Sequence, residues 1–376
     1  LKCPRAQNMD KYHIVRKIAE GRYGSVFLAL LPSGERVAIK RIRALRLPGH
    51  DSWKNAEREA DILRVVEHPH VVSLLDHVVS STEVSLVFEH LAWDLSVALD
   101  QRCFDECQTR TALKMLLLGV TELHARNIMH RDLKPANLLL GETGVLKIAD
   151  FGSARFRQES EPLEILTREV CTRWYKSPEM LFGSVNYTVA VDLWAVGCVF
   201  GDLLSCVCRA LFPGKSDIDQ LCQIFAHVGI PQERDWPDVS RLPDFGKIEF
   251  SEREKKPFPF ESCRSVASLR LLRSFLQLNP ALRMSAAESL EDEFFHAEFA
   301  DLRSLVASLE ERNRTSVDRV SDEFLDFREF EPLSPFVPPE SVADEFLTEN
   351  MGHSTGHATP PPPERGHVFK SSFTHA

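Results

Sequence analysis

The string HRDLKPANLLL, at residues 130–140, constrains the fold of this chain more than any other stretch. An apolar segment with helical spacing precedes it, and the run VLKIADFG follows it as a strand that ends at Asp150, Phe151 and Gly152. Asp132 of the string and Asp150 are 18 positions apart. A charged string with this spacing between a helix and a strand is so specific that chance is a negligible explanation, and the remaining segments are interpreted around it.

The rest of the chain divides into a strand-rich part and a helix-rich part. Strand-like runs separated by turns occupy 12–43 and 71–90, and apolar residues at helical spacing predict a helix at 53–66 between them. From about residue 95 onward the pattern is helical, at 110–127, 190–205, 217–229 and 266–278. The predicted fold class is therefore α+β, with a small N-terminal β-sheet lobe that has one key helix, followed by a larger, mainly helical lobe.

The charge and the cysteines exclude several classes of function. The net charge is −10 over 376 residues, and residues 301–376 hold 14 acidic and 7 basic side chains, so most of the excess lies there. No basic stretch favours a nucleic acid or a membrane surface as a partner. Nine scattered cysteines without zinc-ligand spacing are typical of reduced thiols. Because no apolar run is long enough to span a bilayer and no secretory signal opens the chain, we expect a cytoplasmic and/or nuclear protein.

Beyond about residue 298 the composition becomes acidic and rich in Phe and Pro, with a run of prolines at 360–363. Such a composition predicts a largely disordered tail. The string DEFL occurs there twice, at 322–325 and 344–347, and either binds a partner or recurs by chance. Ser334 and Thr359, each followed by proline, are candidate phosphorylation sites.

The motifs at 130–152, with the hairpin AEGRYGSV at 19–26 and the string VAIK that ends at Lys40, resemble those of eukaryotic protein kinases. The resemblance extends from the hairpin to about residue 297. It implies the two-lobed protein kinase fold. The implied division is an N-terminal segment 1–11, a kinase domain 12–297 with N-lobe 12–88, hinge 89–94 and C-lobe 95–297, and a tail 298–376.

The resemblance implies ATP and Mg²⁺ as cofactors, and phosphoryl transfer explains the residue types in the string. The reaction needs neutralised phosphate charge and a nucleophile placed in line. Asp150 and Asn137 are suited to hold Mg²⁺ through oxygen atoms. Asp132 is the candidate base for the substrate hydroxyl, and Lys134 would neutralise the transferred phosphoryl group. Any one of these residues alone could be a solvated turn residue; the complete string favours the catalytic interpretation.

Glu59 is the predicted partner of Lys40. In the helix at 53–66 it falls between Ala56 and Leu63, on the apolar face. A carboxylate that points toward a core is costly unless it is paired. We therefore expect an ion pair between Glu59 and Lys40 that grips the α- and β-phosphates, the alternative being an exposed glutamate.

In this context the hairpin AEGRYGSV is a glycine-rich loop over the phosphates. Ala19 stands where such loops usually have a first glycine, so we expect weakened rather than abolished nucleotide affinity. The resemblance assigns nucleotide binding to Ile18, Gly21, Gly24, Val26, Ala38, Lys40, Phe88, Glu89, Leu91, Asp94 and Leu139. Of these, Glu89 and Leu91 would use backbone groups, and Asp94 would lie near the ribose. The string FPGKS at 212–216 lacks the first glycine of a P-loop and predicts a turn.

Two segments narrow the resemblance to the cyclin-dependent group, namely EVCTRWYKSPEMLFG at 169–183 and LFPGKSDIDQLCQIFAHVGIPQERDWP at 211–237. Within this group, RDLKPANLL and LPDFGKIEF are most similar to the cell cycle-related kinase. The resemblance implies a Ser/Thr protein kinase with an activation loop at 150–179 and an activating phosphorylation site at Thr167. It assigns the clamp for that phosphate to Arg58, Arg131 and Arg155, whose charges would repel one another without an anion.

Further matches concern regulation and support of the C-lobe. Tyr23 matches the inhibitory phosphotyrosine position, the alternative being a plain aromatic residue of the loop. Thr172 matches the threonine that braces the catalytic aspartate. Glu179 and Arg283 match a buried pair that anchors the helical lobe.

Several positions depart from the cyclin-dependent pattern. Lys176 stands where an arginine shapes the pocket for proline after the target residue, and lysine cannot make the same two-pronged contact. Ser177 replaces an alanine, and Ser153 replaces a leucine after D-F-G. The string WKNAERE at 53–59 replaces the usual cyclin-contacting sequence, which argues against a cyclin-like activator.

Two functions are consistent with this sequence. The first is an active ATP- and Mg²⁺-dependent Ser/Thr kinase whose protein substrates carry proline after the target residue. The second is a pseudokinase scaffold that acts through its surface and tail. The complete catalytic set favours the active enzyme.

Overall fold

The computed structural model describes residues 9–21, 24–43, 46–47, 50–101, 104–157, 173–205, 210–250 and 254–317. These ranges all belong to one compact unit, Leu1–Asp322. Several predicted sites lie outside the described residues, namely Tyr23, Thr167, Thr172, Ser334, Thr359 and both DEFL strings.

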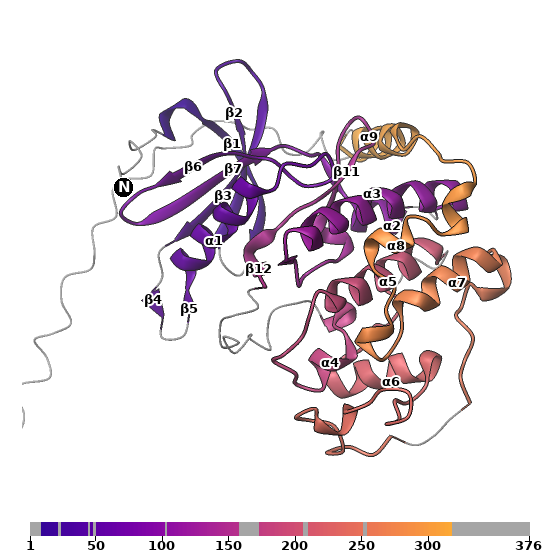
Figure 1. Cartoon of the computed structure of the whole chain (residues 1–376). Helices are drawn as coiled ribbons and strands as arrows, with labels where there is room; N and C mark the ends of the chain where they lie inside the picture. The colour runs from indigo at the N-terminus through magenta and orange to yellow at the C-terminus, as the bar shows by residue number, and fades with distance from the viewer. Residues whose placement is uncertain are drawn as a thin grey trace, which may run out of the picture. The chain divides into compact units, whose positions relative to one another are not determined.

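The N-terminal part is a five-stranded antiparallel sheet with the strand order β1-β2-β3-β7-β6 (Figure 1). Its strands are β1 (His13–Gly21), β2 (Gly24–Leu30), β3 (Arg36–Arg43), β6 (Leu74–Val79) and β7 (Glu83–Glu89). The short strands β4 (Arg46–Leu47) and β5 (His50–Asp51) pair with each other. The predicted turn between β2 and β3 contains Gly34, whose φ of 86° favours glycine. The strands predicted at 12–43 are therefore present.

Helix α1 (Ser52–Val65) packs against β3, β6 and β7. Its buried side chains follow helical spacing and include Ala56, Glu59, Ala60 and Leu63. The helix ends just before His68, which precedes a proline and is thereby disfavoured in the helical region. The predicted helix at 53–66 is confirmed to within one residue at each end.

The C-terminal part is mainly helical. Its helices are α2 (Leu95–Gln101), α3 (Glu106–Ala125), α4 (Pro178–Leu181), α5 (Ala190–Leu204), α6 (Asp217–Val228), α7 (Val266–Phe275), α8 (Ala286–Ser289) and α9 (Arg303–Val317). Every residue of α5 is buried, so this helix is the centre around which α3 and α7 pack. The predicted α+β arrangement is thus present.

Short strands and 3₁₀ helices position the loops between these helices. Strand β10 (Leu138–Leu140) lies between β8 (Trp93–Asp94) and β11 (Leu146–Ile148), and β9 (Ile128–Met129) pairs with β12 (Arg155–Phe156). The 3₁₀ helices are η1 (Met9–Lys11), η2 (Pro135–Asn137), η3 (Phe151–Ser153), η4 (Arg173–Tyr175), η5 (Val239–Arg241), η6 (Glu261–Cys263), η7 (Pro280–Leu282) and η8 (Glu293–His296).

Helix α9 departs from the expectation that the chain is disordered from residue 298 onward. Leu302, Leu305, Val306 and Leu309 recur at helical spacing and are at most 1% exposed. They join the main hydrophobic core. The acidic, Phe- and Pro-rich composition of the whole tail concealed this short amphipathic stretch.

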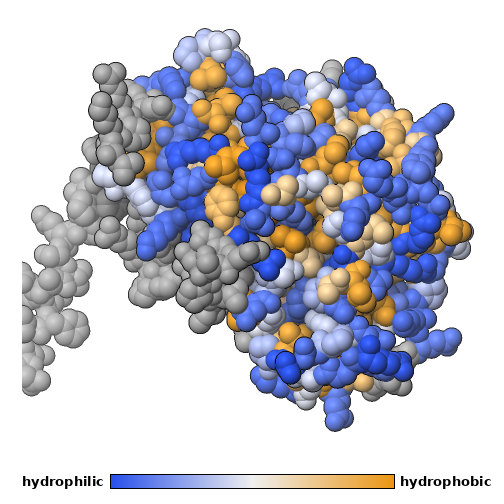
Figure 2. Space-filling model, viewed as in Figure 1, coloured by the Kyte–Doolittle hydropathy of each residue, from blue (hydrophilic) through white to orange (hydrophobic). Residues whose placement is uncertain are grey.

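Hydrophilic side chains cover most of the face in Figure 2, and apolar side chains form groups among them. None of the helices in the described part of the chain has the length and apolar character that crossing a bilayer requires.

Candidate active site

The side chain of Asp192 in α5 holds the start of the string HRDLKPAN in place. Its carboxylate accepts hydrogen bonds from the backbone amides of His130 (2.9 Å) and Arg131 (2.8 Å). His124 of α3 lies 3.0 Å from the same carboxylate. Burial would raise the pKa of Asp192, but His124 and the charge-stabilising backbone contacts hold it below its usual value. Arg131 takes a left-handed conformation with φ of 67°, a strained geometry that these contacts stabilise.

The predicted catalytic residues Asp132, Lys134 and Asn137 lie together. The Nζ atom of Lys134 is 2.9 Å from Oδ2 of Asp132. Asn137 donates from Nδ2 to the backbone oxygen of Asp132 at 2.8 Å and to its carboxylate at 3.2 Å. A single carboxylate is therefore oriented by one cation and one amide, which fixes the direction in which it can accept a proton.

Lys40 on β3 contacts two carboxylates. Its ammonium nitrogen lies 2.9 and 2.8 Å from the two oxygens of Glu59 on α1, and 2.7 Å from Oδ1 of Asp150. Glu59 is 2% exposed, whereas the Asp150 side chain is 49% exposed. The charge of Lys40 lowers the pKa of Asp150 to about 2. Asp150 is thus an anion at neutral pH.

The backbone around Asp150 is unusual for a residue with a side chain. Asp150 has φ of 62° and ψ of 72°, in the left-handed region. Gly152 follows it closely, and a Cβ atom there would lie 3.4 Å from carboxylate oxygens of both Asp150 and Glu59. These are ordinary van der Waals distances, so packing alone does not require a glycine at 152.

The glycine-rich hairpin has one glycine whose presence is required by packing. Gly21 and Gly24 face each other at the ends of β1 and β2. A Cβ atom on Gly24 would lie 2.0 Å from the backbone oxygen of Arg41, so no larger residue fits. Ala19 pairs with Val26 directly after an irregularity in the ladder between Lys17 and Ala19, and its backbone does not take a positive φ.

The residues predicted to bind adenine lie on adjacent strands. Val26 pairs with Lys40 between β2 and β3, and Ala38 pairs with Phe88 between β3 and β7. Ile18 lies on β1 and is partly exposed. These positions share one sheet, as a nucleotide site beneath the hairpin requires.

Two further residues predicted to bind the nucleotide, Glu89 and Asp94, have side chains that form hydrogen bonds with other parts of the protein. Glu89 accepts hydrogen bonds from Lys147 at 2.7 and 2.9 Å and from the backbone amide of Ser73 at 2.8 Å. Its backbone amide donates to the backbone oxygen of Ser73 at 3.3 Å, and the use of its backbone by a nucleotide stays a prediction. Asp94 uses Oδ1 to accept from the amide of Ser96, which caps the start of α2. Leu139 on β10 pairs directly with Asp94.

The three arginines of the predicted phosphate clamp lie on three elements. Arg58 of α1 donates to Asn55 at 2.8 Å, and Arg155 of β12 donates to the backbone oxygen of Ala154 at 2.8 Å. Arg131 donates to the backbone oxygen of Ser153 at 2.7 Å. Helix α1 packs against β12, which brings the elements of Arg58 and Arg155 into contact. Because position 153 contributes its backbone, serine serves there as well as leucine.

The end of the predicted activation loop is fixed by hydrogen bonds of two aromatic residues, the buried Tyr175 and the exposed Trp174. Tyr175 donates to the carboxylate of Asp202 at 2.7 Å, and Trp174 donates from Nε1 to the backbone oxygen of Gly214 at 3.1 Å. The string FPGKS therefore supports Trp174, and its Ser216 caps the start of α6. It acts as a structural turn rather than as a phosphate-binding loop. Ser177 is buried at the start of α4, and its hydroxyl has no hydrogen-bond partner among the described residues.

Glu179 and Arg283 form the predicted buried pair. The guanidinium makes two parallel contacts to the carboxylate, at 2.6 and 2.7 Å. It also donates to the backbone oxygen of Ala190, and it lies over the ring of Trp194. Helices α4 and α5 are thereby joined to the segment before α8.

The chain matches the protein kinase domain over residues 12–295. The chain belongs to the protein kinase family. It is 43% identical over 296 residues to cyclin-dependent kinase 20 of Danio rerio, an alignment that covers 76% of this chain and 84% of that protein. The human cyclin-dependent kinase 20 is 42% identical over the same length, with 76% and 83% covered. This kinase is therefore a Ser/Thr phosphotransferase of the cyclin-dependent type, and the predicted family, enzyme class and two-lobed fold are confirmed.

Membership of this family implies ATP together with a divalent cation. Three residues that hold the site of this kinase were not predicted from the sequence: Asp192, His124 and Lys147. Asp192 had one visible signal, because it is a carboxylate in a helix that, apart from Asp202, contains only apolar residues and glycine. His124 and Lys147 could not be identified in this way, because their contacts join segments that are distant in the sequence.

Proposed function

We propose that this kinase transfers the γ-phosphoryl group of ATP to serine or threonine in protein substrates, with Mg²⁺ as the cation. The observation that carries the proposal is a link between two polar sets. Lys40 contacts Glu59 and Asp150, and Asp132 contacts Lys134 and Asn137. The amide of Ala149, next to Asp150, donates to the backbone oxygen of Asn137 at 2.9 Å and joins them. Asp132 accepts the proton of the substrate hydroxyl. Lys40, held by Glu59, binds the α- and β-phosphates.

The donor set fits the proposed cation. Asp150 supplies an anionic carboxylate because its pKa is about 2. Asn137 donates through Nδ2 to Asp132, and its amide oxygen is the second ligand that we propose. When bound, Mg²⁺ neutralises charge on the phosphates. Lys134 lies beside Asp132 and stabilises negative charge at the same place.

We propose that phosphorylation of Thr167 activates this kinase and that Arg58, Arg131 and Arg155 bind the phosphate. The support is the position of Arg131, which lies next to Asp132 and already donates to Ser153 beside the D-F-G motif. A phosphate bound there would join the activation loop to the catalytic loop. We further propose that proline follows the target residue and that the kinase acts in the cytoplasm and/or the nucleus; the string WKNAERE at 53–59 argues against a cyclin-like activator.

The test is transfer of labelled phosphate from ATP–Mg²⁺ to an arrayed peptide library. Asp132→Asn should lower turnover by about 10²–10⁴-fold without unfolding the chain. Asp235→Asn, on the exposed surface, is the matched control. Full activity of the Asp132 variant would exclude this residue as the base.

The same library tests the finer proposals. Transfer that favours peptides with Ser-Pro or Thr-Pro supports proline direction, and equal transfer to other peptides refutes it. Thr167→Ala should lower activity, because the loop then lacks the phosphate that the arginines bind. Equal activity of the phosphorylated chain and this variant would refute activation at Thr167.

A further inference from the structure

Helix α9 spans two elements that border the proposed nucleotide site. Its start lies on the turn between β10 and β11, where a Cβ atom on Gly144 would be 2.6 Å from the backbone nitrogen of Arg303. Farther along, Arg312 donates to the backbone oxygen of Gln101 at 2.8 Å, at the last residue of α2. The helix is thus in contact with the turn at one point and with α2 at another.

Both elements adjoin residues of the proposed nucleotide site. Strand β10 holds Leu139, which pairs with Asp94 on β8. The carboxylate of Asp94 in turn caps α2 by accepting from the amides of Ser96 at 2.9 Å and Val97 at 3.1 Å. A displacement of α2 or of the turn is therefore transmitted to Asp94 and Leu139.

The same turn also contacts the hinge. A Cβ atom on Gly141 would lie 3.3 Å from the side chain of Leu91. Lys147, on the strand that leaves the turn, binds both carboxylate oxygens of Glu89. The turn thus borders the two residues whose backbone groups are proposed to bind adenine.

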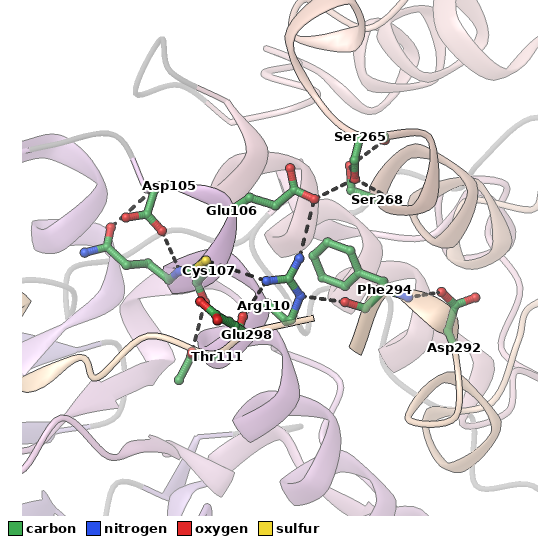
Figure 3. A network of polar contacts seen from close by, with 11 residues as sticks. Asp105, Glu106, Cys107, Arg110, Thr111, Ser265, Ser268, Asp292, Phe294 and Glu298 are labelled. Carbon is green, nitrogen blue, oxygen red and sulfur yellow. Dashed lines mark hydrogen bonds and ion pairs between the residues drawn. The ribbon is translucent and has the colours of Figure 1, made fainter. Parts of the chain in front are cut away.

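The chain that leads into α9 is fixed to α3 by a buried polar network (Figure 3). Arg110 donates to the backbone oxygens of Phe294 at 2.5 Å and Glu298 at 2.6 Å, and it lies over the ring of Phe294. Thr111 bonds with both backbone groups of Ala300, at 3.0 and 2.9 Å. These bonds satisfy buried polar groups on both sides, so the path of the chain up to α9 is defined.

We propose that α9 is a positioning element for nucleotide binding. In its docked form it holds the β10–β11 turn and α2, and through them Leu139, Asp94 and the hinge. The inference rests on the nucleotide site proposed above. Asp192 of α5, rather than α9, holds the backbone directly before Asp132. Loss of α9 contacts therefore changes the affinity for ATP more than the rate of phosphoryl transfer.

The test compares variants of the full chain at saturating peptide. Leu305→Ala combined with Leu309→Ala removes two buried contacts of α9, and Glu311→Ala on the exposed side of the same helix is the matched control. The double variant should raise KM for ATP about 10-fold and change kcat by less than about twofold, while the control changes neither. Thermal unfolding of the same samples shows that the assays use folded protein. A merely structural role would lower the unfolding temperature and leave KM unchanged, and that result would overturn the inference.

A second variant decides the outcome if the double variant does not fold. Arg312→Ala leaves the core intact and removes the contact with α2, so KM for ATP should rise about threefold. An unchanged KM in this folded variant would overturn the inference. Lys40→Met, assayed for ATP binding in parallel, separates the two proposals. If Lys40→Met binds ATP normally, the proposed nucleotide site is wrong; if it loses ATP while the α9 variants bind normally, only the role of α9 is wrong.

Discussion

Lys40 and Glu59 form a buried ion pair across 19 positions of sequence, with the ammonium 2.9 and 2.8 Å from the two carboxylate oxygens. Asp150 shares the same ammonium at 2.7 Å. A strand, a helix and the D-F-G motif therefore meet at one cation. Displacement of any of the three elements would change the environment of the charge that is proposed to bind the phosphates.

Glu59→Gln should lower kcat/KM for ATP by about 10–10²-fold, because a charge-assisted contact of about 1.5–3 kcal/mol is lost. Lys40 would then remain with Asp150 alone and compete with the divalent cation for that carboxylate. Steady-state kinetics with ATP as the varied substrate measures the effect. Glu67→Gln, on the exposed residue just beyond α1, is the control. Unchanged kinetics in the Glu59 variant would remove the pair from the proposed mechanism.

Arg283→Lys should lower the free energy of unfolding by about 3–5 kcal/mol, because one buried ammonium cannot replace the two contacts that the guanidinium makes to Glu179. Urea unfolding followed by tryptophan fluorescence measures the change. Arg303→Lys is the control, since its partner Asp301 is exposed. Equal losses of unfolding free energy in both variants would show that the buried pair contributes no more to stability than the exposed pair.

Asp202 predicts a pH dependence of stability. Burial raises its pKa to about 7 in the folded chain, although Tyr175 and the amide of Leu211 favour the charged form. In the unfolded chain an aspartate ionises near about pH 3.9, so between these values the folded chain holds a proton that the unfolded chain has released. The free energy of unfolding therefore falls as the pH rises through this window, by at most about 1.4 kcal/mol per pH unit.

Asp202→Asn should abolish this slope. Between about pH 5 and about pH 7 the wild-type chain should lose about 2–3 kcal/mol relative to the variant, measured by urea unfolding at each pH. Asp235→Asn at the surface controls for the change in charge. Parallel curves for wild type and Asp202→Asn would show that Asp202 is already ionised at the lower pH.

Lys176→Arg should sharpen the preference for proline after the target residue. The guanidinium offers a planar, two-pronged contact that lysine lacks, so the ratio of kcat/KM for Ser-Pro over Ser-Ala peptides should rise about 10-fold. Lys215→Arg, in the turn before α6, is the control. A ratio that stays constant would exclude position 176 as the determinant of proline direction.

The catalytic residues could be predicted because local sequence defines them. The string at 130–140 is one continuous stretch of sequence that forms a loop, η2 and β10, and helical phase alone predicts that Glu59 points inward, as the structure shows. The supports of the site could not be found this way. The contact of Lys147 with Glu89 joins residues 58 positions apart, and only the fold brings them together.

Helix α9 was not predicted from the sequence for a different reason. Its leucines have clear helical spacing, yet they stand in a stretch whose average composition is that of a disordered segment. A window that averages over the whole tail conceals the 15 residues of this helix, whereas the spacing of Leu302, Leu305 and Leu309 indicates a buried face.

The hydrogen bonds of Arg110 have a consequence for the synthesis of this chain. The carbonyl groups that it binds belong to residues 184 and 188 positions later, so they leave the ribosome long after α3. Until then the guanidinium must remain hydrated, because burying it without partners is costly. We therefore expect the helical lobe of the nascent chain to stay open until residue 298 has emerged, with the apolar side of α3 accessible to chaperones while it waits.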